Sequence, residues 1–370
     1  MHEAAHEPAI PNRWYGVLRS AALGRRPVAV RRLGLPIVLY RRADGSPVAL
    51  LDRCSHRGAA LSRGRVRGDE IECPYHAFRF DGGGRCTAIP CEGPDARIPG
   101  GMDVPAFAVR EAHGVVWLWW GAAPQALGLA ELPPLPWLDA IPEGPDVARS
   151  EMDYVWPVPL HRTLEANFDV YHAAVIHSFG VPKLGRMTQC EVEACVVEGE
   201  RIQLRVDTFD PHDRSAHFPV VVTSHLPGVT LIELGDLYKI VTIDAPIDDD
   251  HVWRCLIHVR PNVRWAHLGS LAMRGWQRLD YWVTQRLQDL PPVRSQTLPV
   301  PGVFADKLVR ADAGTAQYIR LRRKLLREEA ARRHLLPAHV RWASGWTDEP
   351  GHVPLAALGR PRAAADAPSS

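Results

Sequence analysis

The chain has 370 residues, of which 46% are hydrophobic and 23% are charged. A chain of this length and composition can bury a large core, so it is neither a disordered protein nor a disulfide-stapled miniprotein, and it has room for two domains. The formal net charge of +2 from 44 basic and 42 acidic residues gives no domain-wide basic excess for binding nucleic acid or a membrane surface.

The cysteine count and the apolar segments indicate the compartment. Seven cysteines are an odd number, which one chain cannot pair completely. The N-terminal segment MHEAAHEPAIPNRW lacks the basic and apolar regions of a signal peptide. The most apolar run, VVWLWWG at 115–121, is too short to span a bilayer. We therefore expect a reducing cytoplasm, where clustered Cys and His indicate a metal site more often than a disulfide.

The first third of the chain is rich in strand signals. Turn-forming glycines separate short β-branched or apolar runs at 27–32, 36–40, 48–51, 107–110 and 115–120. This pattern predicts a small all-β domain over residues 12–122. A proline-rich connector follows it, at residues 122–148.

The rest of the chain combines strands with longer helical patterns. Residues 160–177 are predicted to be helical, and long helical patterns return at 272–290 and about 306–335. Strands predicted between these helices lie at 202–206, 220–223, 229–234, 238–243 and 253–258. We expect an α+β domain over residues 150–340, with an antiparallel sheet and helices on one side. Residues 341–370 are expected to be a disordered tail.

Two short segments each combine a cysteine with a histidine. Cys54-Ser55-His56 is followed, after sixteen residues, by Cys73-Pro74-Tyr75-His76. This pattern has three interpretations: ordinary core residues, a structural zinc site or a Rieske [2Fe–2S] centre. In zinc fingers the cysteines and the histidines usually cluster by type, whereas here they alternate. In a Rieske centre two Cys hold one iron and two His hold the other, so each loop supplies one ligand to each iron, and alternation favours this interpretation.

At this point the chain resembles a known family. The segments Cys54–Gly64 (CSHRGAALSRG) and Glu72–Phe80 (ECPYHAFRF) are similar to the Rieske domain of Rieske non-haem iron oxygenases. After the second histidine the chain has Ala77-Phe78, where the family usually has Gly-Trp. The resemblance implies a [2Fe–2S] cluster with one iron on Cys54 and Cys73 and the other on His56 and His76.

A second constellation has the pattern Asp169-x2-His172-x4-His177. Asp169 and His172 are three residues apart and share one helix face. His177 would lie roughly 140° further around a straight helix. The two histidines can therefore converge on one metal only if the helix is distorted or ends near Ile176, and residues 178–180 (SFG) predict such an end. Two half-buried polar histidines without a metal are the alternative.

The resemblance assigns roles to this constellation. It implies that His172 and His177 are ligands of a mononuclear Fe(II), in a triad of two histidines and one carboxylate. Asp169 matches the family's acidic residue that is generally not a ligand. That residue bridges, by hydrogen bonds, from a cluster histidine of the neighbouring subunit to the mononuclear site. The family usually has Asn three residues before this Asp, where this chain has Ala166, and Asn167 lies two before it.

The third ligand is expected to be a carboxylate from the C-terminal helices. The segment Gln288–Gln296 (QDLPPVRSQ) resembles the family's segment in which the Asp after Gln is the ligand. This assigns Asp289, with Asp306 as the second candidate. The other acidic residues considered are Asp280 and Asp312, and an ordinary exposed helical Asp is the alternative.

The resemblance covers about residues 13–335 and implies the catalytic α subunit of an oxygenase. Within the family, the chain is similar to the α-only branch that includes vanillate O-demethylase and pheophorbide a oxygenase-like enzymes. That branch implies a helix-grip (START/Bet v 1-like) catalytic domain and a head-to-tail homotrimer. The implied reaction uses O₂ to hydroxylate, demethylate or oxidatively cyclise an apolar or aromatic small molecule, with natural-product biosynthesis among the open settings.

Two features of the sequence bear on the partners and the substrate pocket. No G-x-G-x-x-G motif follows a strand, so electrons are expected from a ferredoxin and/or an NAD(P)H-dependent reductase. We expect strands within residues 200–260 and the 180–190 loop to line the pocket. Two other classes stay open: a Rieske electron-transfer protein with a non-catalytic small-molecule-binding domain, and a zinc-stabilised binding module.

Overall fold

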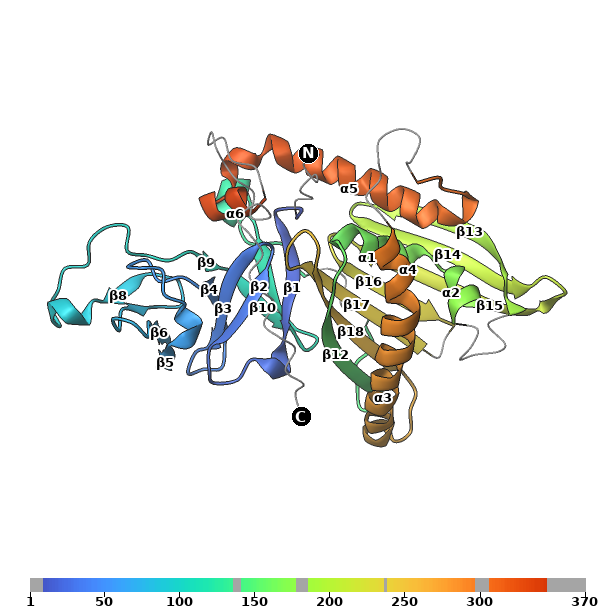
Figure 1. Ribbon diagram of the computed structural model, residues 1–370, viewed down its shortest axis with the longest axis horizontal. Coiled ribbons are helices and arrows are strands. Elements are labelled where there is room, and N and C mark those ends of the chain that lie inside the picture. The colour runs from blue at the N-terminus through green and yellow to red at the C-terminus, as the bar shows by residue number, and fades with distance from the viewer. Residues whose placement is uncertain (1–8, 136–140, 178–185, 236–237, 297–305, 345–370) are drawn as a thin grey trace.

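The computed structural model describes residues 9–135, 141–177, 186–235, 238–296 and 306–344. Small β-sheets formed by the first part of the chain lie beside a larger sheet, and the helices of the second part cover that larger sheet (Figure 1). This arrangement confirms the expected α+β class.

The N-terminal part consists of three small antiparallel sheets, as the all-β prediction required. The first has the order β1 (Arg13–Arg19), β11 (Val115–Trp120), β10 (Val109–Ala112). The second has the order β2 (Val28–Arg32), β3 (Leu35–Arg41), β4 (Pro47–Leu51), β9 (Ala106–Phe107). The third has the order β5 (Arg65–Arg67), β6 (Glu70–Glu72), β7 (Arg79–Phe80), β8 (Cys86–Ala88). All six residues of β11 are buried, because its aromatic side chains are part of the core.

The second part is built on one seven-stranded antiparallel sheet. Its order is β12 (Ala148–Trp156), β18 (Val252–Arg260), β17 (Tyr238–Pro246), β16 (Val229–Leu234), β15 (Asp213–His225), β14 (Arg201–Asp210), β13 (Gln189–Glu198). The first and last strands of this part of the sequence, β12 and β18, pair along their whole length, from Ala148 with Arg260 to Trp156 with Val252.

Strand β18 shows how the two faces of this sheet differ. Successive side chains of a strand point to opposite faces. Trp253, Cys255 and Ile257 belong to the apolar core that includes β1 and β11 of the N-terminal part. Arg254 and His258 face the helices, where they approach α1 and α3 respectively. Both faces are covered, so eight of the nine residues of β18 are buried.

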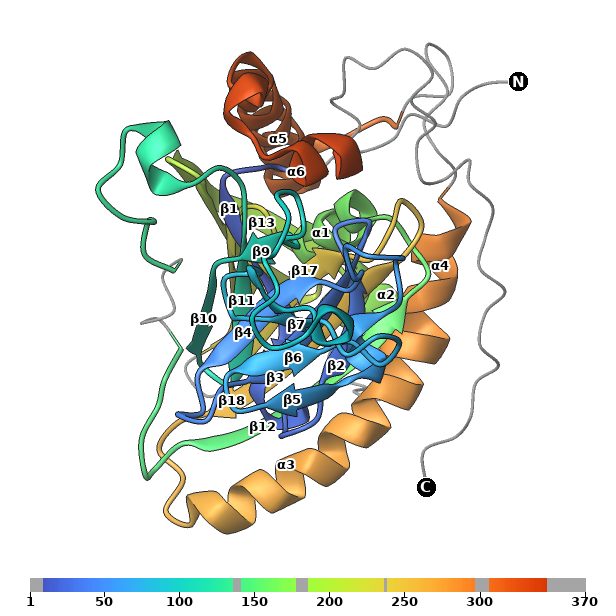
Figure 2. The ribbon, with the colours of Figure 1, turned by 90° about the vertical axis from the view of Figure 1, so that its left-hand side faces the viewer.

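Helices cover the second face of the sheet. They are α1 (Leu160–Phe168), α2 (His172–Ile176), α3 (Ala266–Asp280), α4 (Leu290–Ser295) and α5 (Ala313–Ala331), with a π-helix at Tyr281–Asp289 between α3 and α4. The last helix, α6 (Ala338–Ala343), instead packs into the core that includes β1 and β11. Figure 2 shows α3 along the outer side of the molecule. Among the described helices, none combines the length and apolarity needed to cross a membrane.

The helix boundaries differ from the sequence predictions in three places. The helix predicted at 160–177 is interrupted at 169–171. The helix predicted at 272–290 begins earlier, at Ala266, and is a π-helix from Tyr281. The last long helix starts at Ala313, after a 3₁₀ turn in which the Asp312 carboxylate accepts a hydrogen bond from the Val309 amide at 2.7 Å.

The C-terminal helices connect the two parts of the molecule. In α5, Glu329 is 3% exposed and accepts a hydrogen bond from the Asn12 side chain at 2.6 Å. The predicted tail begins at residue 341, but α6 continues to Ala343 and Ser344 is buried. The remainder of that tail, 345–370, lies outside the described residues.

Candidate functional site

The two loops of the N-terminal part that carry Cys54-x-His56 and Cys73-x2-His76 have the same backbone hydrogen bonds. In each loop the cysteine amide donates to the carbonyl five residues further on, at 2.8 Å. In each loop the cysteine carbonyl also accepts from the amide four residues further on, at 2.8 Å for Cys54 and 3.1 Å for Cys73. The repeated turn therefore presents two equivalent Cys-His pairs.

The four side chains associate by type. Cys54 and Cys73 are 2% and 3% exposed. Burial raises the pKa of Cys54 to about 11, and the neighbouring Cys73 thiol contributes to the rise. The imidazole rings of His56 and His76 lie 4.6 Å apart, and His56 is exposed. The thiols thus form an inner pair and the imidazoles an outer pair.

This arrangement decides between the two metal interpretations of the loops. A single zinc ion needs all four donor atoms around one point. Among the described residues, these four do not form a group whose donor atoms all lie within 4.8 Å of one another. An inner thiol pair and an outer imidazole pair instead fit two irons, one held by sulfur and one by nitrogen.

The departure of this chain from the family pattern has a structural cost. Ala77 has a φ of 60°, at the position where the first loop has Gly58 with a φ of 75°. A non-glycine residue in this left-handed conformation costs roughly 1–2 kcal/mol. Phe78, the second departure, stacks on His56 with ring centroids 4.6 Å apart and an interplanar angle of 5°.

Ala77→Gly is therefore expected to stabilise the protein. The relief of backbone strain exceeds the extra entropy that glycine gives the unfolded chain, so the net gain should be about 0.5–1 kcal/mol. The measurement is the thermal unfolding midpoint of the cluster-loaded protein. Ala60→Gly is the matched control, because Ala60 has an ordinary φ of −65°, and it should lower the midpoint. Equal losses in both variants would contradict the account.

A second constellation lies in the other part of the molecule. The Nε2 atoms of His177 and His172 lie 3.1 and 3.7 Å from the same oxygen, Oδ1 of Asp289. Among the described residues, these three form the group whose donor atoms are all within 4.8 Å of one another. The structure thus brings together the three residues that the sequence proposed as metal ligands.

Breaks in the helices produce this convergence. Helix α2 begins at His172 and ends at Ile176, as expected, and His177 follows it with φ −97° and ψ 0°. The ring centroids of the two histidines are consequently 5.3 Å apart. Asp289 is the last residue of the π-helix, a rare conformation that is frequently found at functional sites.

The three residues fit a bound cation. Asp289 Oδ1 is buried and receives no well-aligned hydrogen bond, although two imidazoles face it. Burial by itself would lower the pKa of His177, but Asp289 raises the pKa above its ordinary value. The site therefore attracts positive charge, and two imidazoles with one carboxylate are the donor set of non-haem Fe(II).

The other acidic residues considered for this role lie elsewhere. Asp306 forms an ion pair with Arg162 at 2.9 Å, and Asp312 accepts a hydrogen bond from the Tyr171 hydroxyl at 3.1 Å. Asp280 is nearer to the triad, and its pKa is raised by burial and by the neighbouring Asp289 carboxylate. None of the three belongs to the group of converging donor atoms.

Asp169 lies beside the triad, at the surface. Its Oδ1 atom is 3.3 Å from the backbone nitrogen of His172 and 3.6 Å from His172 Nδ1. The side chain of Asp169 is 36% exposed. It therefore faces the imidazole nitrogen that is turned away from Asp289 and remains open to an approaching partner.

A buried polar network under the triad was not predicted from the sequence. The Arg254 guanidinium donates to Asp244 at 2.8 Å and to Asn167 Oδ1 at 3.1 Å. The Asn167 amide donates in turn to Thr230 and Thr242 at 3.2 and 3.1 Å. The network holds the end of α1, from which the segment with Asp169 departs. The sequence feature that could have indicated this network is a charged residue inside each of two otherwise apolar strands, Asp244 in TIDAP and Arg254 in VWRCLIHV.

A buried histidine on the same face of the sheet was also missed. His258 is 1% exposed, its Nδ1 is hydrogen-bonded to the Tyr238 hydroxyl at 2.6 Å, and burial lowers its pKa to about 4. Its Nε2 lies 3.9 Å from Asp280. Burial therefore favours the uncharged imidazole of His258 on the wall of the sheet next to the triad.

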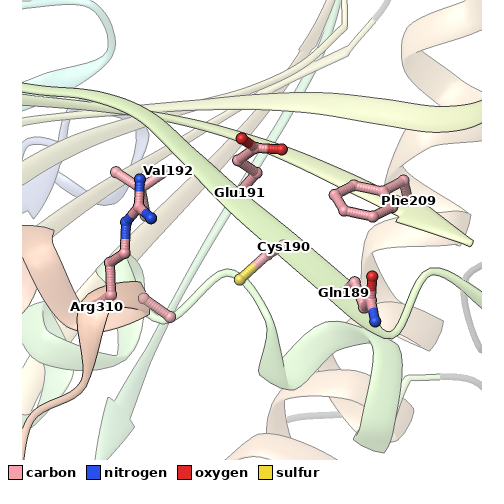
Figure 3. Close-up of a pocket in the computed structure, with 7 residues that line it drawn as sticks. Gln189, Cys190, Glu191, Val192, Phe209 and Arg310 are labelled. Atoms are coloured by element: carbon pink, nitrogen blue, oxygen red, sulfur yellow. The ribbon is translucent and has the colours of Figure 1, made fainter. Parts of the chain in front are cut away.

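The expected substrate pocket is only partly within the described residues. Residues 180–185 of the predicted 180–190 loop lie outside them. A cavity of about 260 Å³ lies at the edge strand β13, and Cys190 and Arg310 are among the residues that line it (Figure 3). None of the triad residues lines this cavity, so it is separate from the metal site.

Comparison with known proteins identifies the N-terminal part. The family model described as the Rieske [2Fe-2S] domain matches residues 13–108, which include both Cys-His loops. The chain carries a Rieske domain. This match confirms the [2Fe–2S] cluster that the resemblance implied and excludes the zinc-stabilised module.

Curated relatives extend the resemblance. Residues of this chain are 31% identical over 172 positions to aminopyrrolnitrin oxygenase PrnD of Pseudomonas fluorescens, covering 45% of this chain and 46% of the relative. They are 40% identical over 112 positions to the dicamba O-demethylase oxygenase component of Stenotrophomonas maltophilia, covering 30% and 32%. The 3-chlorobenzoate-3,4-dioxygenase oxygenase subunit of Comamonas testosteroni is 29% identical over 303 positions, covering 78% and 63%. In each case the matched part of this chain covers less than two thirds of the relative's length.

Solved structures show the same fold along most of the chain. Dicamba monooxygenase bound to dicamba has a TM-score of 0.68 at 21% identity and covers 88% of this chain and 99% of its own. A Pseudomonas putida CBB5 NdmA variant with theobromine has a TM-score of 0.66 at 24% identity, covering 87% and 91%. The two-part fold of this chain is therefore also that of dicamba monooxygenase and NdmA. The curated relatives, which are named as oxygenases or their components, confirm the resemblance.

Proposed function

We propose that this chain is the terminal oxygenase component of a Rieske non-haem iron system. It uses O₂ and externally supplied electrons to oxidise an apolar or aromatic small molecule. The observation that carries the proposal is the convergence of His172, His177 and Asp289 in the same chain as a Rieske domain. In the triad, a buried carboxylate oxygen of Asp289 lies between two imidazoles and receives no well-aligned hydrogen bond. A protein that only carries electrons through its Rieske cluster would not need such an oxygen.

Each proposed site residue has one role. Cys54 and Cys73 hold one iron of the cluster, and His56 and His76 hold the other. His172, His177 and Asp289 hold a mononuclear Fe(II), which when bound supplies redox chemistry with O₂ at its open coordination positions. Asp169 orients His172 and links the mononuclear site to a neighbouring Rieske domain.

We propose three regions: a Rieske domain at 12–122, a catalytic domain from 150 to the end of α6, and a tail beyond it. A head-to-tail homotrimer would set the outer imidazole pair of one copy, of which His56 is exposed, against the partly exposed Asp169 of the next. Large exposed apolar patches mark contact surfaces. One such patch on this chain supports the proposed assembly. It follows α3 and the π-helix, where these side chains are more than half exposed: Trp265, Leu268, Leu271, Trp276, Leu279, Trp282 and Leu287.

The proposed partners follow from the chemistry of the site. Electrons would come from a ferredoxin and/or an NAD(P)H-dependent reductase, in the cytoplasm. The relatives are named for dicamba, 3-chlorobenzoate and aminopyrrolnitrin, which supports an aromatic substrate. Hydroxylation, demethylation and oxidative cyclisation are the candidate reactions.

Nitric oxide tests the proposal without knowledge of the substrate. Nitric oxide resembles O₂ in size and occupies an open position of an Fe(II) held by three protein ligands. Adding it to the reduced, anaerobic protein should give the EPR signal of a high-spin iron nitrosyl, in addition to the Rieske signal. A panel of aromatic compounds should change that signal when one of them occupies the pocket. A Rieske signal with no nitrosyl signal would favour the electron carrier.

A further inference from the structure

We propose that Gln288 is a positioning residue that fixes the protonation and orientation of His177 for metal binding. The inference rests on the proposed mononuclear site and adds a residue to it. Its basis is one contact: His177 Nδ1 lies 2.8 Å from Gln288 Oε1. Both side chains are half-buried.

The chemistry of the amide determines where the ring proton lies. An amide oxygen only accepts hydrogen bonds, so Nδ1 of His177 must carry the proton in this contact. The Nε2 atom then keeps its lone pair, and it faces Asp289 Oδ1 at 3.1 Å. A histidine must offer such a lone pair to bind a metal. The contact with Gln288 thus selects the tautomer that can bind.

The backbone explains why this contact is firm. Gln288 and Asp289 are the last two residues of the π-helix. They approach the two different nitrogens of one imidazole, Gln288 at Nδ1 and Asp289 at Nε2. One short segment therefore supplies both a ligand and the group that aligns a second ligand, so a shift of the π-helix would disturb both together.

An amide also suits the charge around the triad better than a carboxylate. The corresponding nitrogen of His172 faces the carboxylate of Asp169, at 3.6 Å. Asp280, whose pKa is raised by burial and by Asp289, is a further acidic group nearby. A glutamate at 288 would add another acidic group, whereas glutamine accepts the same hydrogen bond without a charge.

The experiment uses cobalt(II) as the probe. The mononuclear site of the cluster-loaded protein is emptied with a chelator and dialysed against graded cobalt(II). Cobalt is then counted per chain by elemental analysis, which distinguishes it from the cluster irons. The variants are Gln288→Met, close in shape but without a comparable acceptor, and Gln288→Glu, which restores an acceptor. Gln285→Met is the matched control, because Gln285 is in the same π-helix and accepts a hydrogen bond from Tyr154 at 2.9 Å.

Gln288→Met is expected to weaken cobalt binding by about 10–100-fold, the usual effect of removing a partner of a ligand histidine. Gln288→Glu should recover most of the loss, and Gln285→Met should bind like the unaltered protein. The EPR spectrum of bound cobalt(II) should change in Gln288→Met and not in Gln285→Met. Unchanged affinity in Gln288→Met, or equal losses in both Met variants, would overturn the role of Gln288. If the unaltered protein binds no cobalt beside its cluster, the mononuclear site itself is refuted.

Discussion

Asp289→Ala is expected to release the mononuclear iron and to lower turnover by about 100-fold or more. Removal of even an indirect partner of a metal ligand costs 10–100-fold, and here a direct donor is lost. Two imidazoles without the carboxylate also leave the site with no negative charge of its own to offset Fe(II). The Rieske domain uses other residues and should keep its spectrum. Iron content, product formation and the Rieske EPR signal are the measurements.

Asp306→Ala is the matched control for this prediction. Asp306 was the second sequence candidate, but it pairs with Arg162 and its side chain is 54% exposed. The variant should therefore retain the mononuclear iron. Loss of that iron in Asp306→Ala and its retention in Asp289→Ala would reverse the assignment of the third ligand.

Arg254→Met should destabilise the protein by about 3–5 kcal/mol, because it leaves the buried Asp244 carboxylate without its partner. The pair is 3% and 1% exposed. Burial opposes the charge of Arg254, but Asp244 raises its pKa, so the guanidinium remains protonated. Arg254 also donates to Asn167 at the end of α1. Chemical denaturation of the second part of the chain measures the loss.

Two further variants make this prediction specific. The double variant Arg254→Met with Asp244→Leu removes both charges and should recover much of the stability. Arg214→Met removes an ion pair whose side chains are 70% and 56% exposed and should cost less than about 1 kcal/mol. A loss in Arg254→Met as small as that in Arg214→Met would show that the buried network contributes little.

The Rieske loops could be predicted from sequence because their information is local. Each loop places Cys and His two or three residues apart within one turn, and the alternation by type distinguishes a two-iron cluster from a single zinc. The strain at Ala77 was not foreseen, because the residue type alone does not give φ. Only the structural match with Gly58 in the first loop reveals it.

The triad was predicted in two different ways. The spacing of His172 and His177 required a helix end near Ile176, and the structure has that end. Asp289 is more than a hundred residues away, so no local spacing could connect it, and only resemblance proposed it.

The rest of the site depends on long-range pairing that sequence periodicity does not contain. Arg254 and Asp244 meet because β17 and β18 pair in a register that sets these two residues opposite each other. The π-helix at Tyr281–Asp289 was predicted as ordinary helix, since an apolar pattern does not distinguish a wider turn over nine residues. Sequence alone therefore identifies Gln288 as the residue before Asp289, but it does not predict the contact with His177.

Metal and sulfide analysis of the anaerobically purified protein, combined with EPR of its reduced form, tests the central claim most directly. A chain with a Rieske cluster and a mononuclear site should contain three irons and two sulfides, with a reducible Rieske signal. Two irons and two sulfides would contradict the oxygenase and indicate an electron carrier. Zinc without colour would contradict both.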